Sequence, residues 1–187
     1  MNVGVLLFHE VHELDVVGPY TVLHTAKTML EENDLEVFTV AKSRNSVQTS
    51  GDLTITPLYA FASAPQVDAL FVPGGKGVDK AVKDKPLQLY LERTVPSLKH
   101  LLSVSSGSIL LGELGYVRNQ TVTTHHDVLE RLKDYEALSV ANKRIVKSEG
   151  LWSSAAMASG MDLALEFVKE LFDDKLAKRV AVHLGLA

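Results

Sequence analysis

The chain has 187 residues, which suits one domain with a sizeable core, so we treat 1–187 as a single domain. Its 19 basic and 23 acidic residues give a net charge of −4 without a basic stripe, which argues against nucleic acid as a partner. The absence of cysteine excludes disulfides, thiolate catalysis and cysteine-based zinc sites. The apolar run at 3–8 lacks the features of a signal peptide, and no run is long enough to span a membrane. We therefore expect a soluble cytoplasmic protein with no membrane contact.

Four continuous apolar runs of strand length lie at 3–8, 35–41, 68–72 and 100–104. Runs of this kind, rather than alternating patterns, indicate strands buried on both faces of a parallel sheet. Apolar residues at helical spacing predict helices between the runs, at 15–29, 87–95 and 108–114. Pro19 suits the first turn of the first helix, and Gly115 suits a left-handed cap after the last.

The remaining segments complete an alternation of strands and helices. Residues 47–57 break at Ser50-Gly51-Asp52, which predicts a small antiparallel hairpin appended to the sheet with a structural role. The other expected elements are a strand at 121–124, a helix at 128–135 capped by Asp127, a strand or hairpin at 138–147, a long amphipathic helix at 155–172 and a final helix at 173–183. The order predicts a doubly wound α/β fold, with a mostly parallel sheet between layers of helices.

The stretch 101–111 runs from an apolar strand directly into a helix through the sequence SVSSG. A sharp turn with small residues on both sides lifts the side chain at its apex out of the sheet and leaves backbone N–H groups beside it. The apex residue is Ser105, at a position where α/β enzymes hold a nucleophile. A serine hydroxyl attacks poorly unless a general base accepts its proton, so the chemistry requires a partner group.

Four segments in register resemble the DJ-1/PfpI superfamily of glutamine-amidotransferase-like proteins, and within it the isonitrile-hydratase-like branch. They read VLLFHEVHELDVVGP at 5–19, DALFVPGGKG at 68–77, SVSSG at 103–107 followed by TVTTH at 121–125, and SSAAMASGMDLAL at 153–165. The resemblance implies a flavodoxin-like fold, a homodimer, a small-molecule substrate or ligand, and no cofactor or metal. It also implies a cysteine where this chain has Ser105, and a threonine where it has Ser106.

The resemblance further implies which residues surround Ser105. Asp15 is expected beside it, where burial would raise the pKa of the carboxyl and suit it to proton transfer. The alternative is a carboxylate that only serves the start of the first helix. The loop at Gly74 and Gly75 is expected to supply backbone amides, with those of Gly75 and Ser106 forming an oxyanion hole; an ordinary tight turn is the alternative.

Three further side chains are candidates for the pocket: His125 as a base or substrate contact, and His126 and Trp152 as lining residues. A surface position is the alternative for His125, with Asp127 either orienting it or capping the next helix. Trp152 alternatively packs in the core. The cluster of His9, Glu10, His12 and Glu13 lacks zinc-site spacing, so these are interpreted as loop residues.

Two functions remain open. The first is hydration of a small electrophile of the isonitrile type to an N-substituted formamide, by Ser105 or by a water molecule that Asp15 activates. The second is a catalytically quiet protein that binds or senses a small ligand, its nucleophile having been lost. A glyoxalase or deglycase activity is least expected because it depends on cysteine. The apolar faces of the helices at 20–29 and 155–172 are predicted surfaces for a symmetric dimer.

Overall fold

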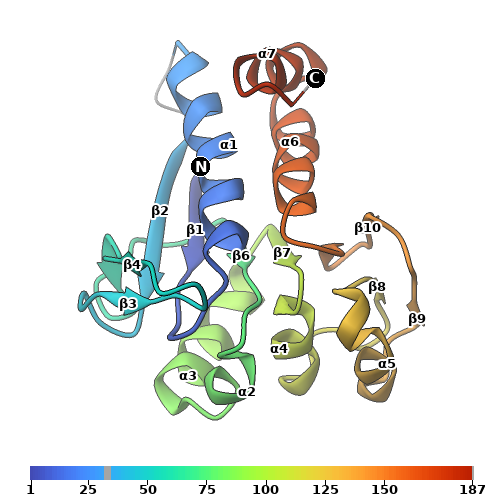
Figure 1. Ribbon diagram of the computed structural model, residues 1–187. Helices are drawn as coiled ribbons and strands as arrows, with labels where there is room; N and C mark the ends of the chain where they lie inside the picture. Colours follow the sequence, from blue (N-terminus) through green and yellow to red (C-terminus); the bar gives the residue numbers. More distant parts are fainter. Residues whose placement is uncertain (32–34, 187) are drawn as a thin grey trace.

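The computed structural model describes residues 1–31 and 35–186 and has a seven-stranded central sheet (Figure 1). The strand order is β10-β11-β7-β6-β1-β2-β5, and every pair is parallel except β10 with β11. The strands are β1 (Asn2–Leu6), β2 (Glu36–Ala41), β5 (Tyr59–Ala60), β6 (Ala69–Val72), β7 (His100–Val104), β10 (Ile145–Lys147) and β11 (Trp152–Ser154). The predicted doubly wound fold is therefore confirmed.

Two groups of helices cover the sheet. Figure 1 shows α1 (Glu13–Met29), α6 (Ser159–Leu171) and α7 (Asp174–His183) in the upper part of the view. The lower part holds α2 (Val78–Ala81), α3 (Lys85–Thr94), α4 (Gly107–Glu113) and α5 (Leu129–Leu132). The strands lie between these groups, as in a three-layer α/β arrangement.

Helices α1 and α6 pack against each other over the sheet. A Cβ added at Gly160 would lie 2.8 Å from Val104 Cγ1 and 3.3 Å from Pro19 Cγ, so α6 contacts both β7 and α1 closely. The ring of Phe167 in α6 meets that of Phe71 in β6 edge to face, with centroids 5.7 Å apart. Apolar residues of these helices, such as Leu23 and Phe167, are buried within the single chain, whereas Val17 of α1 is exposed. The use of these helices in a symmetric dimer stays a prediction.

Several element boundaries differ from the predictions for local reasons. Helix α1 begins at Glu13 because the His12 side chain accepts a hydrogen bond from the Leu14 N–H, so Pro19 lies inside the helix rather than in its first turn. His125, not Asp127, caps the next turn, a 3₁₀ helix at His126–Val128 that precedes α5 and a second 3₁₀ helix at Lys133–Tyr135. The cap at Gly115 has the predicted left-handed conformation, with φ of +83°.

Two small sheets lie outside the central one. Strands β3 (Val47–Gln48) and β4 (Thr54–Ile55) form the predicted antiparallel hairpin, but it is a separate sheet. Strand β8 (Thr121–Val122) pairs in parallel with β9 (Ser139–Val140), whereas β10 joins the central sheet. The segment 138–147 therefore contributes strands to two different sheets and is neither one strand nor a hairpin.

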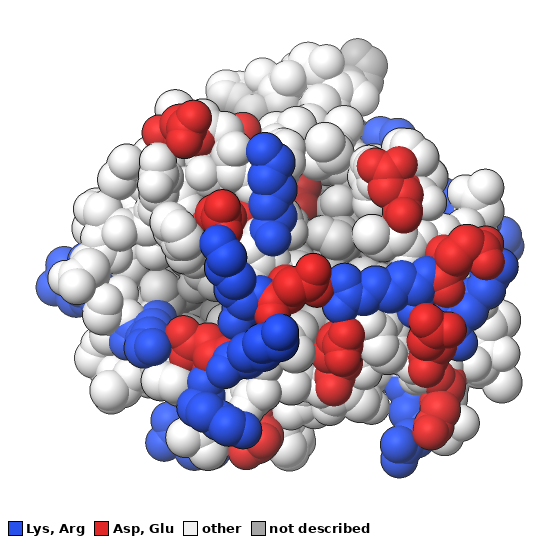
Figure 2. Space-filling view, turned by 60° about the horizontal axis from the view of Figure 1, so that its bottom comes forward, with Lys and Arg blue, Asp and Glu red and all other residues white. Residues whose placement is uncertain are grey.

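Charged side chains of both signs lie among one another on the face shown in Figure 2. Arg131 of α5 contacts Asp79 of α2 at 2.7 Å and Glu113 of α4 at 2.8 Å, so a single guanidinium connects three helices. None of the helices within 1–31 and 35–186 combines the length and apolar character needed to cross a membrane.

Candidate active site

The candidate site lies where three parallel strands end. The loop after β1 leads into α1, the loop after β6 contains the two glycines, and the turn after β7 presents Ser105. Strand β1 lies between β2 and β6, where the order of strands reverses. The carboxyl ends of strands beside such a reversal form the usual ligand-binding crevice of open α/β sheets.

Ser105 forms the predicted sharp turn between β7 and α4. Its φ is +54°, a left-handed conformation that costs a residue with a Cβ about 1–2 kcal/mol. Three hydrogen bonds hold it: its N–H donates to the Ser154 carbonyl at 2.9 Å, and its carbonyl accepts from Ser108 Oγ at 3.2 Å and Thr124 Oγ1 at 3.0 Å. The turn is thus fixed by its backbone, which leaves the side chain free for chemistry.

The hydroxyl of Ser105 has no hydrogen-bond partner among the residues that the structure describes, and the residue is 6% exposed. We expect Ser105→Gly to raise the free energy of unfolding by about 1 kcal/mol, because glycine adopts this φ without strain. The melting temperature would then rise by about 2–4 °C for a chain of this size. Ser105→Ala is the control, since it removes the hydroxyl and keeps the strained Cβ. An equal gain in both variants would assign the effect to the hydroxyl.

Asp15 is fully buried and reaches across to the glycine loop. Its Oδ2 accepts a hydrogen bond of 2.9 Å from the N–H of Gly74, 59 positions along the chain. Its Oδ1 has no hydrogen-bond partner within the described part of the chain and lies 3.8 Å from Nδ1 of His12. Because His12 provides the helix cap, capping does not explain Asp15.

Burial raises the pKa of Asp15 from 3.8 to about 6. The hydrogen bond from Gly74 and the nearby His12 lower the pKa and offset part of this effect, whereas Glu13 raises it slightly. A carboxyl with a pKa near 6 holds and releases a proton near neutral pH, as general acid–base catalysis requires. The free Oδ1 is the atom available for that exchange.

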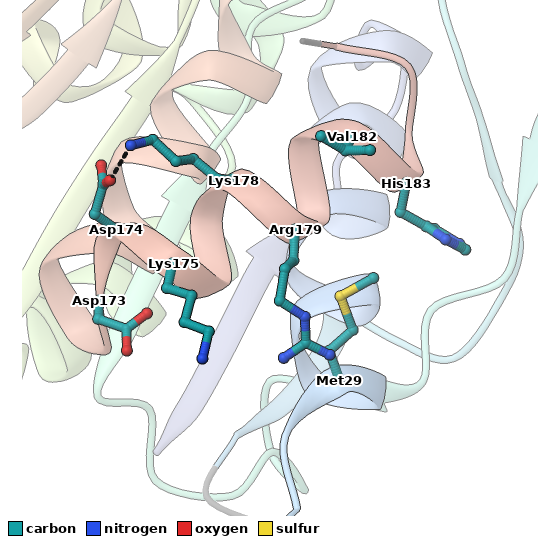
Figure 3. A pocket seen from close by; sticks show the side chains of 8 residues that line it. All are labelled: Met29, Asp173, Asp174, Lys175, Lys178, Arg179, Val182 and His183. Carbon is teal, nitrogen blue, oxygen red and sulfur yellow. Dashed lines mark ion pairs between the residues drawn. The ribbon is translucent and has the colours of Figure 1, made fainter.

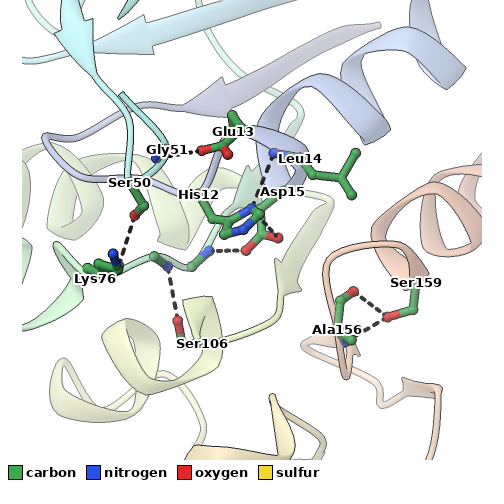
Figure 4. A network of polar contacts seen from close by, with 12 residues as sticks. His12, Glu13, Leu14, Asp15, Ser50, Gly51, Lys76, Ser106, Ala156 and Ser159 are labelled. Atoms are coloured by element: carbon green, nitrogen blue, oxygen red, sulfur yellow. Dashed lines mark hydrogen bonds and ion pairs between the residues drawn. The ribbon is translucent and has the colours of Figure 1, made fainter. Parts of the chain in front are cut away.

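The two glycines connect Asp15 to the turn, as Figure 4 shows. While the Gly74 N–H holds Asp15, the next N–H along, that of Gly75, donates to Ser106 Oγ at 3.0 Å. Gly75 has φ of +138°, a conformation that suits glycine. The predicted oxyanion hole of the Gly75 and Ser106 amides is therefore not open here, because the Ser106 hydroxyl occupies the Gly75 amide.

The hairpin turn also supports this site, a contact that the sequence did not indicate. The Gly51 N–H donates to Glu13 Oε2 at 3.1 Å, at the start of α1. Ser50 Oγ donates to the Glu10 carbonyl at 2.6 Å and accepts from the Lys76 N–H at 3.2 Å (Figure 4). The hairpin thus joins the loops that flank Asp15 and is more than an appended element.

The remaining candidates, Trp152, His125 and His126, differ in their position relative to Ser105. Trp152 pairs with Leu102 in the sheet and contacts the ring of His100, toward the start of β7, so it lies away from Ser105. His125 follows Thr124, whose hydroxyl bonds the Ser105 carbonyl, and it contacts Asp127 at 3.4 Å. The side chain of His126 is 76% exposed and contacts the same carboxylate at 3.0 Å. Of these three, His125 is connected to the turn through its neighbour.

A hollow lined by described residues lies elsewhere, beside α7 (Figure 3). It has a volume of about 900 Å³ and contains none of the predicted site residues. Its lining comprises Met29, Asp173, Asp174, Lys175, Lys178, Arg179, Val182 and His183. This hollow therefore adds no residue to the candidate site.

Comparison with known proteins agrees with this architecture. Isonitrile hydratase of Pseudomonas putida is 31% identical over 190 residues, spanning 100% of this chain and 79% of that protein. A ThiJ/PfpI family protein from Pseudomonas syringae has a TM-score of 0.90 at 25% identity, covering 98% of this chain and 74% of the other. Drosophila melanogaster DJ-1beta, at 19% identity, has a TM-score of 0.87, covering 100% and 98%. The model of the DJ-1/PfpI family matches residues 1–170, and the chain belongs to that family.

Proposed function

We propose that this protein adds water to small isonitriles and releases N-substituted formamides, with Asp15 and Ser105 as its reacting groups. The observation that carries the proposal is the buried Asp15 carboxyl, whose pKa is about 6 and whose Oδ1 has no hydrogen-bond partner among the described residues. The similarity to an isonitrile hydratase along the whole chain supports this substrate class. Isonitriles have a basic terminal carbon, which matches an acid placed to give up a proton.

The proposed first step is protonation. The protonated Asp15 carboxyl gives its proton to the terminal carbon of the isonitrile, which forms a C–H bond and becomes a nitrilium carbon. That carbon is strongly electrophilic, so a neutral hydroxyl can attack it without first becoming an anion. This order of events reduces the demand on the nucleophile, and it suits a serine where relatives are expected to have a cysteine.

The remaining steps return both side chains to their starting states. Ser105 Oγ bonds to the nitrilium carbon and its proton passes to the Asp15 carboxylate, leaving an imidate ester on the serine. Water then adds to the imidate carbon and one of its protons passes to the imidate nitrogen. The C–Oγ bond breaks, the second proton passes to Oγ, and the formamide leaves. One water molecule is consumed, and no redox partner is needed.

In the proposed mechanism, the loop at Gly74 and Gly75 holds the reacting groups in position. The consecutive amides of Gly74 and Gly75 hold Asp15 and Ser106, which fixes the carboxyl relative to the turn. Positioning of this kind is a main source of rate enhancement when reacting atoms must approach closely. If the Ser106 hydroxyl rotates toward substrate, it also frees the Gly75 amide to stabilise the tetrahedral oxygen during imidate hydrolysis.

The test is an assay of the tag-free protein with an alkyl isonitrile, in which the formamide is measured by chromatography. We expect product above the background of Ser105→Ala, because that variant lacks the attacking oxygen. Product that persists in Ser105→Ala would reject Ser105 as the nucleophile and assign attack to a water molecule activated by Asp15. Equal traces of product in both proteins and in buffer would reject hydration and favour the ligand-binding alternative.

A further inference from the structure

We propose that His125, His126 and Asp127 form a binding site for a Zn²⁺ ion. The three residues are consecutive and begin the 3₁₀ turn before α5, so the backbone brings three ligating side chains together. One ligand atom from each lies within 4.8 Å of the others. This site is separate from the reacting groups of the proposed hydration.

Two distances between donor atoms, one to each carboxylate oxygen of Asp127, are close to those around a tetrahedral ion. Two ligands at 2.0–2.1 Å from zinc are about 3.3–3.4 Å apart in tetrahedral geometry. Asp127 Oδ2 lies 3.4 Å from His125 Nδ1, and Asp127 Oδ1 lies 3.0 Å from His126 Nε2. The two imidazole rings face each other with centroids 4.1 Å apart. Small rotations of these side chains therefore suffice to bring the three ligand atoms into contact with one ion.

The chemistry of the donors selects the metal. Two imidazole nitrogens and one carboxylate oxygen suit borderline ions such as Zn²⁺, whereas Mg²⁺ and Ca²⁺ prefer sites made of oxygen alone. Three protein ligands leave the fourth zinc position for water. Within the described residues, no lysine or arginine pairs with Asp127, whose carboxylate contacts only the two histidines and is available to an ion.

In the other histidine-rich stretch, at 9–13, the carboxylates are not available to an ion in the same way. Glu10 is paired with Lys80, Glu13 accepts from the Gly51 N–H, and His12 accepts from the Leu14 N–H. Three of its four potential ligands therefore already have partners. At 125–127, within the described part of the chain, the backbone bond that an ion would displace is a long one of 3.4 Å, from the Asp127 N–H to His125 Nδ1.

Isothermal titration of Zn²⁺ into metal-free, tag-free protein tests the site. We expect one ion per chain, and an affinity lowered by about tenfold or more in His126→Ala and in Asp127→Asn, since each removes one of three ligands. Both side chains are more than 70% exposed, so both variants should fold normally, which circular dichroism checks. His9→Ala is the matched control and should bind zinc as the wild type does.

Nuclear magnetic resonance provides an independent measurement on the same proteins. Zn²⁺ should shift the imidazole signals of His125 and His126 and leave those of His183 unchanged, while an equal concentration of Mg²⁺ should shift none of them. Absence of binding to the wild type would overturn the site. Binding that survives in both His126→Ala and Asp127→Asn, or that is lost in His9→Ala, would also overturn it by placing the ion elsewhere.

Discussion

Replacing Asp15 by asparagine is expected to lower the rate of formamide formation by about 10²–10⁴-fold, the usual contribution of a general acid or base. Asparagine keeps an oxygen that accepts the Gly74 N–H, yet it cannot give up or recover a proton. Because the protonated carboxyl starts the reaction, the wild-type kcat/KM should fall by about tenfold per pH unit above the pKa of about 6.

The same carboxyl should give the protein a characteristic dependence of stability on pH. Its pKa is raised from 3.8 to about 6 on folding, so its stabilising contribution is complete below pH 3.8 and is lost as pH rises through 6. The full difference is about 3 kcal/mol. The amide in Asp15→Asn does not titrate, so urea unfolding at about pH 4 and about pH 7.5 should show the variant gaining most of this amount, about 2 kcal/mol, relative to wild type. A rate within about threefold of wild type, or a stability difference independent of pH, would reject the assigned role of Asp15.

Gly74→Ala is expected to have the second largest effect, because the backbone of the turn leaves no room for a methyl group. An added Cβ would lie 2.6 Å from the Ser106 nitrogen and 3.0 Å from the Gly107 nitrogen. The loop or the turn must move, at a cost of about 1–3 kcal/mol in the free energy of unfolding. A displacement near 1 Å between Asp15 and Ser105 would lower activity by about 10²-fold.

Gly115→Ala is the matched control for this variant. The φ of Gly115 is +83°, but an added Cβ meets no atom of the described residues within 4 Å. The variant should therefore lose about 1 kcal/mol of stability from backbone strain, with unchanged activity. Full activity in a folded Gly74→Ala protein would show that the loop does not set the geometry of the reaction. Equal loss of activity in both variants would attribute it to lowered stability alone.

The parts of the fold that the sequence predicts best are those with long apolar runs. The run at 100–104 predicts a strand, and β7 is found at His100–Val104. Strand β11 escapes prediction because two of its three residues, Ser153 and Ser154, are fully buried serines, which look like a loop in the sequence. Strand β5 escapes prediction because two residues carry too little pattern.

The candidate site, too, can be predicted from the sequence only in part. Recognisable motifs contain Asp15, the two glycines and Ser105. The turn and its connection to Asp15 through Gly74 and Gly75 can therefore be predicted. The contacts of Ser50 and Gly51 with the same loops depend on how the hairpin folds back, which local patterns do not encode. Trp152 is close in sequence to Ser154, which suggests a position in the pocket. In an extended strand, however, residues two positions apart are already well separated in space, so Trp152 lies outside the pocket.

The polar centre draws on three segments that are distant in sequence, and neighbouring amides of one short loop connect them. None of these segments holds its partner groups in place alone, since the loop is aligned by parallel pairing of β6 with both β1 and β7. The geometry of the candidate site thus depends on the assembled sheet rather than on any one segment. A collapsed but unpaired intermediate, or an excised peptide containing the bend, would possess the same functional groups and remain chemically silent.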